Sequence, residues 1–178
     1  METASDSLRD LRVAEMARLL EDQSNPMYRQ RRKGIGIGLM SDLKFQLRLT
    51  LSEEAALVAR NNPDDAAISS LINILNRHDA VLKCQFDAFA GYVSEAEANG
   101  TQNYPLYEWT KKTVDDPTKK AKYTKSFALY VGGKEVYEKD KADALEAELK
   151  PLVGGSLVEK MFKYDSDPAH NPQPPHLG

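Results

Sequence analysis

Two basic segments of this chain contain the residue types that can hold a phosphate backbone. The first is a short run of cations, and the second is a lysine-rich stretch with aromatic residues close by. Their candidate contact residues are Arg29, Arg31, Arg32, Lys33, Trp109, Lys111, Lys112, Lys119, Lys120 and Lys122. Cations contact phosphates and aromatic rings stack on bases, so segments 29–33 and 111–125 indicate contact with nucleic acid. The same composition is also typical of an ordinary solvated surface.

The overall charge argues against a protein that coats nucleic acid with its whole surface. The formal net charge is −3, whereas such domains are usually strongly basic. A local basic patch remains compatible with this charge.

No cysteine or histidine lies in a pattern that favours catalysis or metal binding. His78 and Cys84 fall on one predicted helix at a spacing that suits neither a nucleophile with its base nor a pair of metal ligands. We therefore expect Cys84 to be a buried thiol. His170 and His176 stand in a proline-rich tail, where we expect them to be solvated. The sequence predicts no catalytic residue, no metal site and no cofactor.

Three glycines at 34, 36 and 38 suggest a loop that cradles a phosphate. Such a loop follows a strand and opens onto a helix. Here the glycines follow the basic run and precede a predicted strand, and no G-K-[ST] ending is present. We interpret the segment as an extended connector.

The cysteine content and the apolar pattern bear on location. A single cysteine cannot form an intramolecular disulfide, so we expect a reducing, cytoplasmic environment. The amino terminus shows no basic leader followed by an apolar run, and no stretch approaches about 18 apolar residues. We expect no insertion into a membrane.

The clearest periodic pattern lies at residues 43–51, where large apolar residues alternate with polar ones. Period two predicts a strand with one buried face. Thr50 and Glu53 have capping-box spacing, and Ser52 is another possible N-cap, so a short helix is predicted over 53–60. From 63 to 98, apolar residues recur about every 3.5 positions, which predicts one long helix closed by Asn99-Gly100. A break near Arg77-His78-Asp79 is the alternative for this segment.

The second half of the chain predicts shorter elements. A helix is expected at 104–114, and Gly132-Gly133 predicts a hairpin over 126–138 because both glycines can take positive φ. Further helices are expected from Asp140 onward and over 156–162. The predicted fold is α+β: one long central helix and short helices pack on a small, mainly antiparallel sheet made of strand 43–51 and hairpin 126–138.

The predicted organisation has four parts. They are an amphipathic helical arm at 1–25, a basic glycine-containing linker at 26–40, a single α+β domain at 41–163 and a proline-rich tail at 164–178. The apolar stripe of the arm is expected to pack on a partner or on the protein's own core. Its candidate partner-binding residues are Leu8, Leu11, Met16, Leu19 and Leu20.

These features favour a non-enzymatic interaction or assembly subunit of a larger complex. It would bind protein partners, or further copies of itself, through the arm, the long helix and the tail. The alternative is a nucleic-acid-binding accessory protein that uses segments 29–33 and 111–125. A third hypothesis is an enzyme whose site is completed at a subunit interface.

Overall fold

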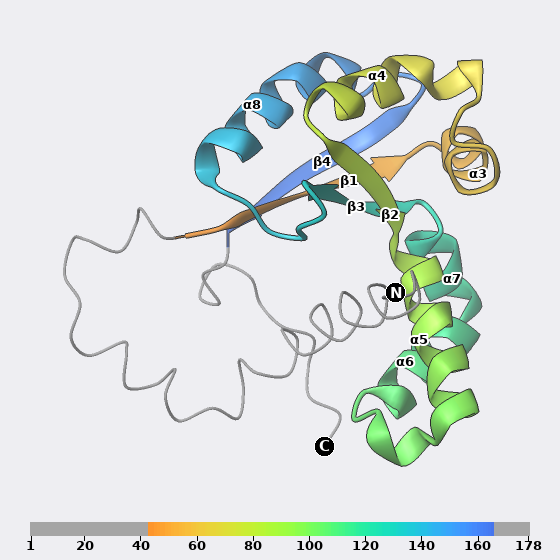
Figure 1. The fold of residues 1–178 in the computed structure, drawn as a ribbon. Coiled ribbons are helices and arrows are strands. Elements are labelled where there is room, and N and C mark those ends of the chain that lie inside the picture. Colours follow the sequence, from red (N-terminus) through yellow and green to blue (C-terminus); the bar gives the residue numbers. More distant parts are fainter. Residues whose placement is uncertain (1–42, 166–178) are drawn as a thin grey trace, which may run out of the picture.

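The structure is a computed structural model, and it describes residues 43–165 (Figure 1). The predicted arm at 1–25, the linker at 26–40 and nearly all of the tail at 164–178 lie outside the described residues.

The strand predicted at 43–51 is confirmed as β1 (Phe45–Leu51). Its leucines at 47, 49 and 51 are buried, as the alternation predicts. The short helix predicted after it is confirmed as α3 (Glu53–Asn61). The hydroxyl of Ser52 caps this helix and accepts a hydrogen bond from the Ala55 amide at 3.2 Å.

The long helix predicted over 63–98 is wrong. This segment forms the 3₁₀ turn η2 (Ala66–Ile68), helix α4 (Ser69–Arg77), strand β2 (Ala80–Cys84) and helix α5 (Gln85–Asn99). Helix α4 ends near the predicted break, and Asp79 then takes a φ of 51°, in the left-handed region that an α-helix cannot continue through. Gly100 follows α5 as predicted, with a φ of 96°.

The hairpin predicted over 126–138 is confirmed only in its first half. Strand β3 (Ser126–Val131) leads into Gly132 and Gly133, whose φ angles are 57° and 73°. Val131 and Lys134 exchange backbone hydrogen bonds across this turn. Beyond Lys134 no second strand forms on β3, because the chain crosses to β1 and Tyr137 pairs with Phe45 instead.

The other helices are close to their predicted positions. Helix α6 (Tyr107–Asp115) and helix α8 (Lys139–Leu149) were expected from the sequence pattern, although Glu138 rather than Asp140 occupies the N-cap of α8. Helix α7 (Pro117–Tyr123) was not expected. It begins after Asp116, whose carboxylate accepts from the amides of Thr118 and Lys119.

The helix predicted over 156–162 is wrong, because the chain forms strand β4 (Val158–Asp165) there. β4 pairs with β1, and the register shifts between Thr50 and Leu51. The extra residue, Glu159, makes a β-bulge, so Val158 and Met161 both face the core although they are three positions apart.

The four strands form one antiparallel sheet in the order β2-β3-β1-β4. Helices α3 and α4 connect β1 to β2, and helix α8 connects β3 to β4. This connectivity is the split β-α-β arrangement, here with helices α5 to α7 inserted between β2 and β3. The predicted α+β class with an antiparallel sheet is confirmed.

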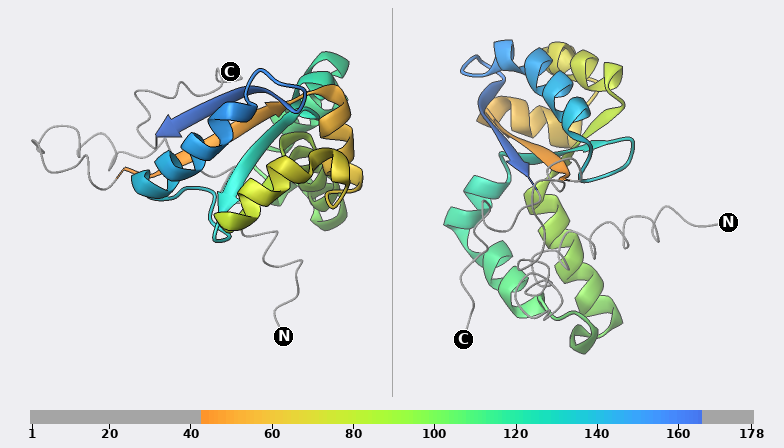
Figure 2. Two further views of the ribbon diagram at one scale, coloured as in Figure 1. Left: turned by 90° about the horizontal axis from the view of Figure 1, so that it is seen from above. Right: turned by 90° about the vertical axis from the view of Figure 1, so that its left-hand side faces the viewer.

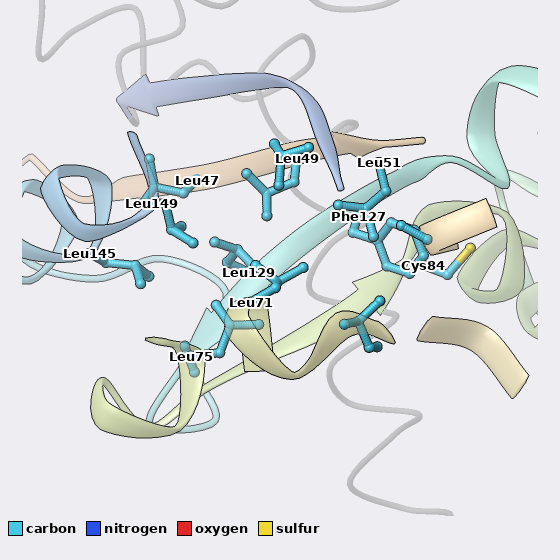
Figure 3. Packing of buried hydrophobic residues seen from close by; sticks show 14 of the residues in the cluster. Leu47, Leu49, Leu51, Leu71, Leu75, Cys84, Phe127, Leu129, Leu145 and Leu149 are labelled. Carbon is cyan, nitrogen blue, oxygen red and sulfur yellow. The ribbon is translucent and has the colours of Figure 1, made fainter. Parts of the chain in front are cut away.

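The main core lies between the sheet and helices α4 and α8, which cover the same face (Figure 1). Figure 3 shows leucines of β1 and β3 facing leucines of α4 and α8 across this layer. Fully buried members include Leu47, Leu71, Leu129, Leu145 and Leu149. Burial of apolar surface on this scale is the dominant favourable term in folding.

Helices α5, α6 and α7 extend away from the sheet on the side opposite α4 and α8 (Figures 1 and 2). A second, smaller core holds them together around Phe89, Tyr92 and Tyr104. The ring of Phe89 meets the rings of Trp109 and Tyr123 edge to face, at centroid distances of 5.8 Å and 5.2 Å.

A buried phenol ties the β3–α8 loop to the central strand. The side chain of Tyr137 is only 1% exposed, and its hydroxyl accepts a hydrogen bond from the Leu47 amide at 2.9 Å. Its backbone also exchanges hydrogen bonds with Phe45. Burial raises the pKa of Tyr137 to about 12.

Replacing Tyr137 with phenylalanine should lower the free energy of unfolding by about 1–3 kcal/mol at pH 8, because the buried Leu47 amide loses its acceptor. Above pH 10 the unfolded chain loses the phenolic proton before the folded chain does, so wild-type stability should fall between about pH 10 and 12. Phenylalanine has no phenolic proton to lose, so up to about 3 kcal/mol of this pH-dependent loss of stability should be absent from Tyr137→Phe. Urea unfolding at pH 8 and pH 11 measures both effects.

Tyr123→Phe is the matched control, because the Tyr123 hydroxyl takes part in no hydrogen bond within residues 43–165. We expect it to change stability by less than about 0.5 kcal/mol. Equal losses in the two variants would contradict the assigned role of Tyr137.

Candidate nucleic-acid interface

The alternation of β1 directs its polar side chains to the face of the sheet opposite α4 and α8. Successive residues of a strand point to opposite faces. Since Leu47 and Leu49 enter the main core, Gln46, Arg48 and Thr50 lie on the other side. We call this side the far face.

Strand register identifies the other residues of the far face. Arg48 is opposite Ala128 on β3 and Phe162 on β4, and Ala128 is in turn opposite Lys83 on β2. The strand residues that share this face are Gln46, Arg48, Thr50, Val81, Lys83, Ser126, Ala128, Tyr130, Lys160, Phe162 and Tyr164. They come from all four strands of the sheet.

The far face is cationic although the chain as a whole is acidic. Its strand positions include Arg48, Lys83 and Lys160, and none of these strand positions is aspartate or glutamate. Within residues 43–165, no ion pair neutralises these three cations. The whole chain, by contrast, has a formal net charge of −3. The far face can therefore attract an anionic ligand.

Aromatic rings accompany the cations on β4. Phe162 is 45% exposed, and its ring lies 6.1 Å from the ring of Tyr164, measured between centroids. The two planes are inclined by 32°. Tyr130, on β3, is buried and 4% exposed. The accessible stacking surface of this face is thus that of Phe162 and Tyr164.

A chain of hydrogen bonds runs from the loop after β3 to the centre of the far face. The side-chain amide of Gln46 donates to the Glu135 carboxylate at 3.0 Å, and its carbonyl oxygen accepts from Nε of Arg48 at 2.6 Å. The guanidinium carbon of Arg48 lies 5.2 Å from the centroid of the Tyr164 ring. Arg48 is therefore held by one hydrogen bond and one cation–π contact.

Apart from Lys125, which follows α7 and pairs with Glu159 at 2.8 Å, the lysines of the predicted segment 111–125 lie on helices α6 and α7. These helices extend on the same side of the sheet as the far face (Figure 2). Lys111 is paired with Glu97 at 3.4 Å and with Asp115 at 3.6 Å. The attraction of Asp115, followed by that of Glu97, raises the pKa of Lys111. No ion pair within residues 43–165 involves Lys112, Lys119, Lys120 or Lys122.

Two of these lysines contact aromatic rings. The ammonium of Lys120 lies 5.4 Å from the Phe86 centroid, and that of Lys122 lies 5.3 Å from the Tyr123 centroid. Trp109 packs edge to face on Phe89 in the second core. This places Trp109 in a packing role within α5–α7.

The remaining predicted site residues lie outside the described residues. They are the cations Arg29, Arg31, Arg32 and Lys33 and the apolar stripe Leu8, Leu11, Met16, Leu19 and Leu20. The glycines at 34–38 and the tail histidines His170 and His176 lie outside as well. Their proposed contacts therefore stay predictions.

Cys84 and His78 lie on different elements, contrary to the single helix predicted for them. Cys84 ends β2 and is buried, as expected, with its sulfur 3.7 Å from the Tyr123 carbonyl oxygen. Burial raises the pKa of its thiol, which keeps it protonated. His78 lies 3.0 Å from the Glu148 carboxylate, and Arg77 also donates to that carboxylate, so α4 is tied to α8.

Between residues 43 and 165, no cluster of three or more histidine, cysteine or carboxylate side chains is placed to hold a metal ion. In the same range, no helix is long and apolar enough to cross a membrane.

Comparisons with protein-family models, with curated proteins and with solved structures find no match to this chain.

The far face was not predicted from the sequence, although one signal for it was visible. The polar half of the β1 alternation contains Gln46, Arg48 and Thr50, and a strand with one buried face must present its other residues together. Phe162 and Tyr164 also alternate, but the bulge at Glu159 hides the period-two pattern of β4.

The assignment of faces can be tested through stability. Phe162→Ala should lower the free energy of unfolding by no more than about 1 kcal/mol, because the side chain is 45% exposed and lies outside the main core. Phe127→Ala should cost about 3–5 kcal/mol, because Phe127 is 2% exposed and lies in the main core. Urea unfolding of the two variants measures the difference, and equal costs would contradict the assignment.

Proposed function

We propose that this protein binds single-stranded nucleic acid on the far face of its sheet. The observation that carries the proposal is the composition of that face. It combines Arg48, Lys83 and Lys160 with the rings of Phe162 and Tyr164, and its strand positions include no carboxylate. Cations that follow a phosphate backbone and aromatic rings that stack on bases are the two components of single-strand recognition.

A single strand fits this arrangement better than a duplex does. Stacking on Phe162 or Tyr164 requires an unpaired base, because a base inside a duplex is already stacked on its neighbours. Aromatic residues on the face of a four-stranded sheet stack bases in a common RNA-binding module. That likeness is one of architecture, so the side chains rather than the fold support the proposal.

The lysines of α6 and α7 provide further support for the same proposal. These helices extend on the side of the far face, and Lys112, Lys119, Lys120 and Lys122 have no ion-pair partner within the described residues. A backbone that leaves the sheet could therefore meet more cations. The second basic segment of the sequence would then extend the binding surface rather than form its centre.

Binding can be measured by fluorescence anisotropy with a labelled 12-nucleotide strand of alternating uridine and guanosine, at several salt concentrations. We expect affinity to fall with salt, with a slope of about −0.7 per phosphate contact. Lys83→Gln and Lys160→Gln should each reduce the size of the slope by about 0.7. Phe162→Ala should weaken binding by about 1–3 kcal/mol through lost stacking.

Two control variants show whether a loss of affinity is specific to the far face or follows from removing any exposed cation or apolar side chain. Lys150→Gln removes an exposed cation outside the far face, and Leu57→Ala removes an exposed apolar side chain of α3. Neither should change affinity by more than about twofold, which corresponds to about 0.4 kcal/mol. The proposal fails if the strand does not bind at low salt, or if the control variants lose as much affinity as the far-face variants.

A second candidate is an interaction or assembly subunit, as the sequence favoured. Its specific support among the described residues is the exposure of large apolar side chains on α3 and on the edge strand β2. Leu57 is 59% exposed and Val81 is 48% exposed. Exposed apolar residues and an unpaired strand edge are features of protein-binding surfaces.

Mass determination and partner pull-down test this second candidate. The full chain should be larger than a monomer or should recover a defined partner, and a chain lacking residues 1–40 or 166–178, which leaves β4 complete, should lose that property. If every form stays monomeric and recovers no partner, the assembly role is wrong. For the interface-completed enzyme, residues 43–165 add no supporting observation: they hold no cluster of possible metal ligands, and Cys84 is buried.

A further inference from the structure

Gln46 is a buried polar side chain in the centre of a sheet face, and its burial needs an explanation. It is 3% exposed, and burying an amide is unfavourable unless its hydrogen bonds are made. Its amide nitrogen donates to the Glu135 carboxylate at 3.0 Å and to the Glu135 carbonyl at 3.3 Å. Its oxygen accepts from Nε of Arg48 at 2.6 Å. These contacts fix which atoms of Arg48 remain available.

The bond from Gln46 engages only the Nε side of the guanidinium. The two terminal nitrogens of Arg48 make no ion pair with any carboxylate of residues 43–165. The contact with the Tyr164 ring also restrains the guanidinium. Arg48 therefore presents a planar pair of donors whose orientation is set before any ligand arrives, which reduces the entropy lost on binding.

The nitrogen-bearing side chains of the far face offer hydrogen-bond donors and no free acceptor, whereas the hydroxyls of Thr50, Ser126 and Tyr164 can both donate and accept. The Gln46 oxygen, which could otherwise accept from adenine, is engaged by Arg48, and its amide group is engaged by Glu135. The cations Lys83 and Lys160 are donors only. A base that binds in this setting should have adjacent acceptors on one edge. Guanine meets that condition through O6 and N7, whereas adenine has a donor beside N7.

We propose that Arg48 recognises guanine in the bound strand, through its two terminal nitrogens and the O6 and N7 atoms of the base. Gln46 acts as a positioning residue that holds Arg48 in the required orientation. This inference rests on the proposed function, since it concerns the same face. A base stacked on Phe162, the residue opposite Arg48 in the strand register, would lie within the same part of the face.

The test compares 12-nucleotide strands that differ only in the purine. Oligouridine strands that carry a single central guanosine, inosine, adenosine or 7-deazaguanosine cannot pair with themselves, and they are measured by anisotropy against the full chain, together with the corresponding DNA strands. Guanosine and inosine strands, which share O6 and N7, should bind about 5- to 150-fold more tightly than the adenosine strand. The 7-deazaguanosine strand, which lacks N7, should fall towards the adenosine value. Comparison of RNA with DNA shows whether the sugar matters.

Two variants link the preference to the proposed residues. Arg48→Lys keeps the charge but replaces the fixed planar pair of donors with a flexible ammonium, so the preference for guanosine should fall while affinity for the adenosine strand changes by less than about threefold. Gln46→Met keeps the volume and removes the hydrogen bonds, so it should reduce the same preference. Thermal unfolding of both variants shows that the fold is retained.

These measurements distinguish a failure of nucleic-acid binding from a failure of guanine recognition. If no strand binds, the proposed function is wrong and guanine recognition falls with it. If all strands bind equally, or if Arg48→Lys weakens every strand by the same factor, the guanine inference is wrong while the binding function stands. Loss of guanosine preference in Arg48→Lys alone, with Gln46→Met unchanged, would overturn the positioning role of Gln46.

Discussion

The two-residue alternation of β1 is the constraint on which the rest of the structure depends. β1 lies between β3 and β4, so its leucines must face the helices and its polar residues must face the other way. A shift of one residue would move Leu47, Leu49 and Leu51 out of the core and bury Arg48. Tyr137 protects this register, because its hydroxyl and backbone bond to Leu47 and Phe45. The same alternation creates the core and the far face together.

Those features of the fold that depend on local patterns were predictable. The alternation at 43–51, the cap at Ser52 and the glycine pair at 132–133 each act within a few residues, and each is confirmed. The α+β class followed from these elements. Cys84 was expected to be a buried thiol and is one, although it ends a strand rather than lying in a helix.

The two missed strands were hidden for physical reasons. Leu75, Leu82 and Phe86 keep a helical spacing across α4, β2 and α5, and only the polar pair His78-Asp79 interrupts it. In β4 the bulge at Glu159 changes the spacing of Val158 and Met161 from two to three, which imitates a helix. Lys163 further obscures the strand pattern, because this charged residue occupies a position that faces the helices. It pairs there with Asp143 and Glu146 of α8. An inward charge also protects an edge strand from pairing with other chains. Because these two strands were missed, the residues that share the far face could not be predicted from the sequence.

Backbone NMR shift mapping tests most directly the proposal that a single nucleic-acid strand lies on the far face. A 12-nucleotide strand of alternating uridine and guanosine would be added to the isotope-labelled full chain. We expect the largest shifts at β1 and β4, around Arg48, Phe162 and Tyr164, with smaller shifts along α7. Helices α4 and α8, on the opposite face, should change little. Shifts confined to α4 and α8, or no shifts at all, would contradict it.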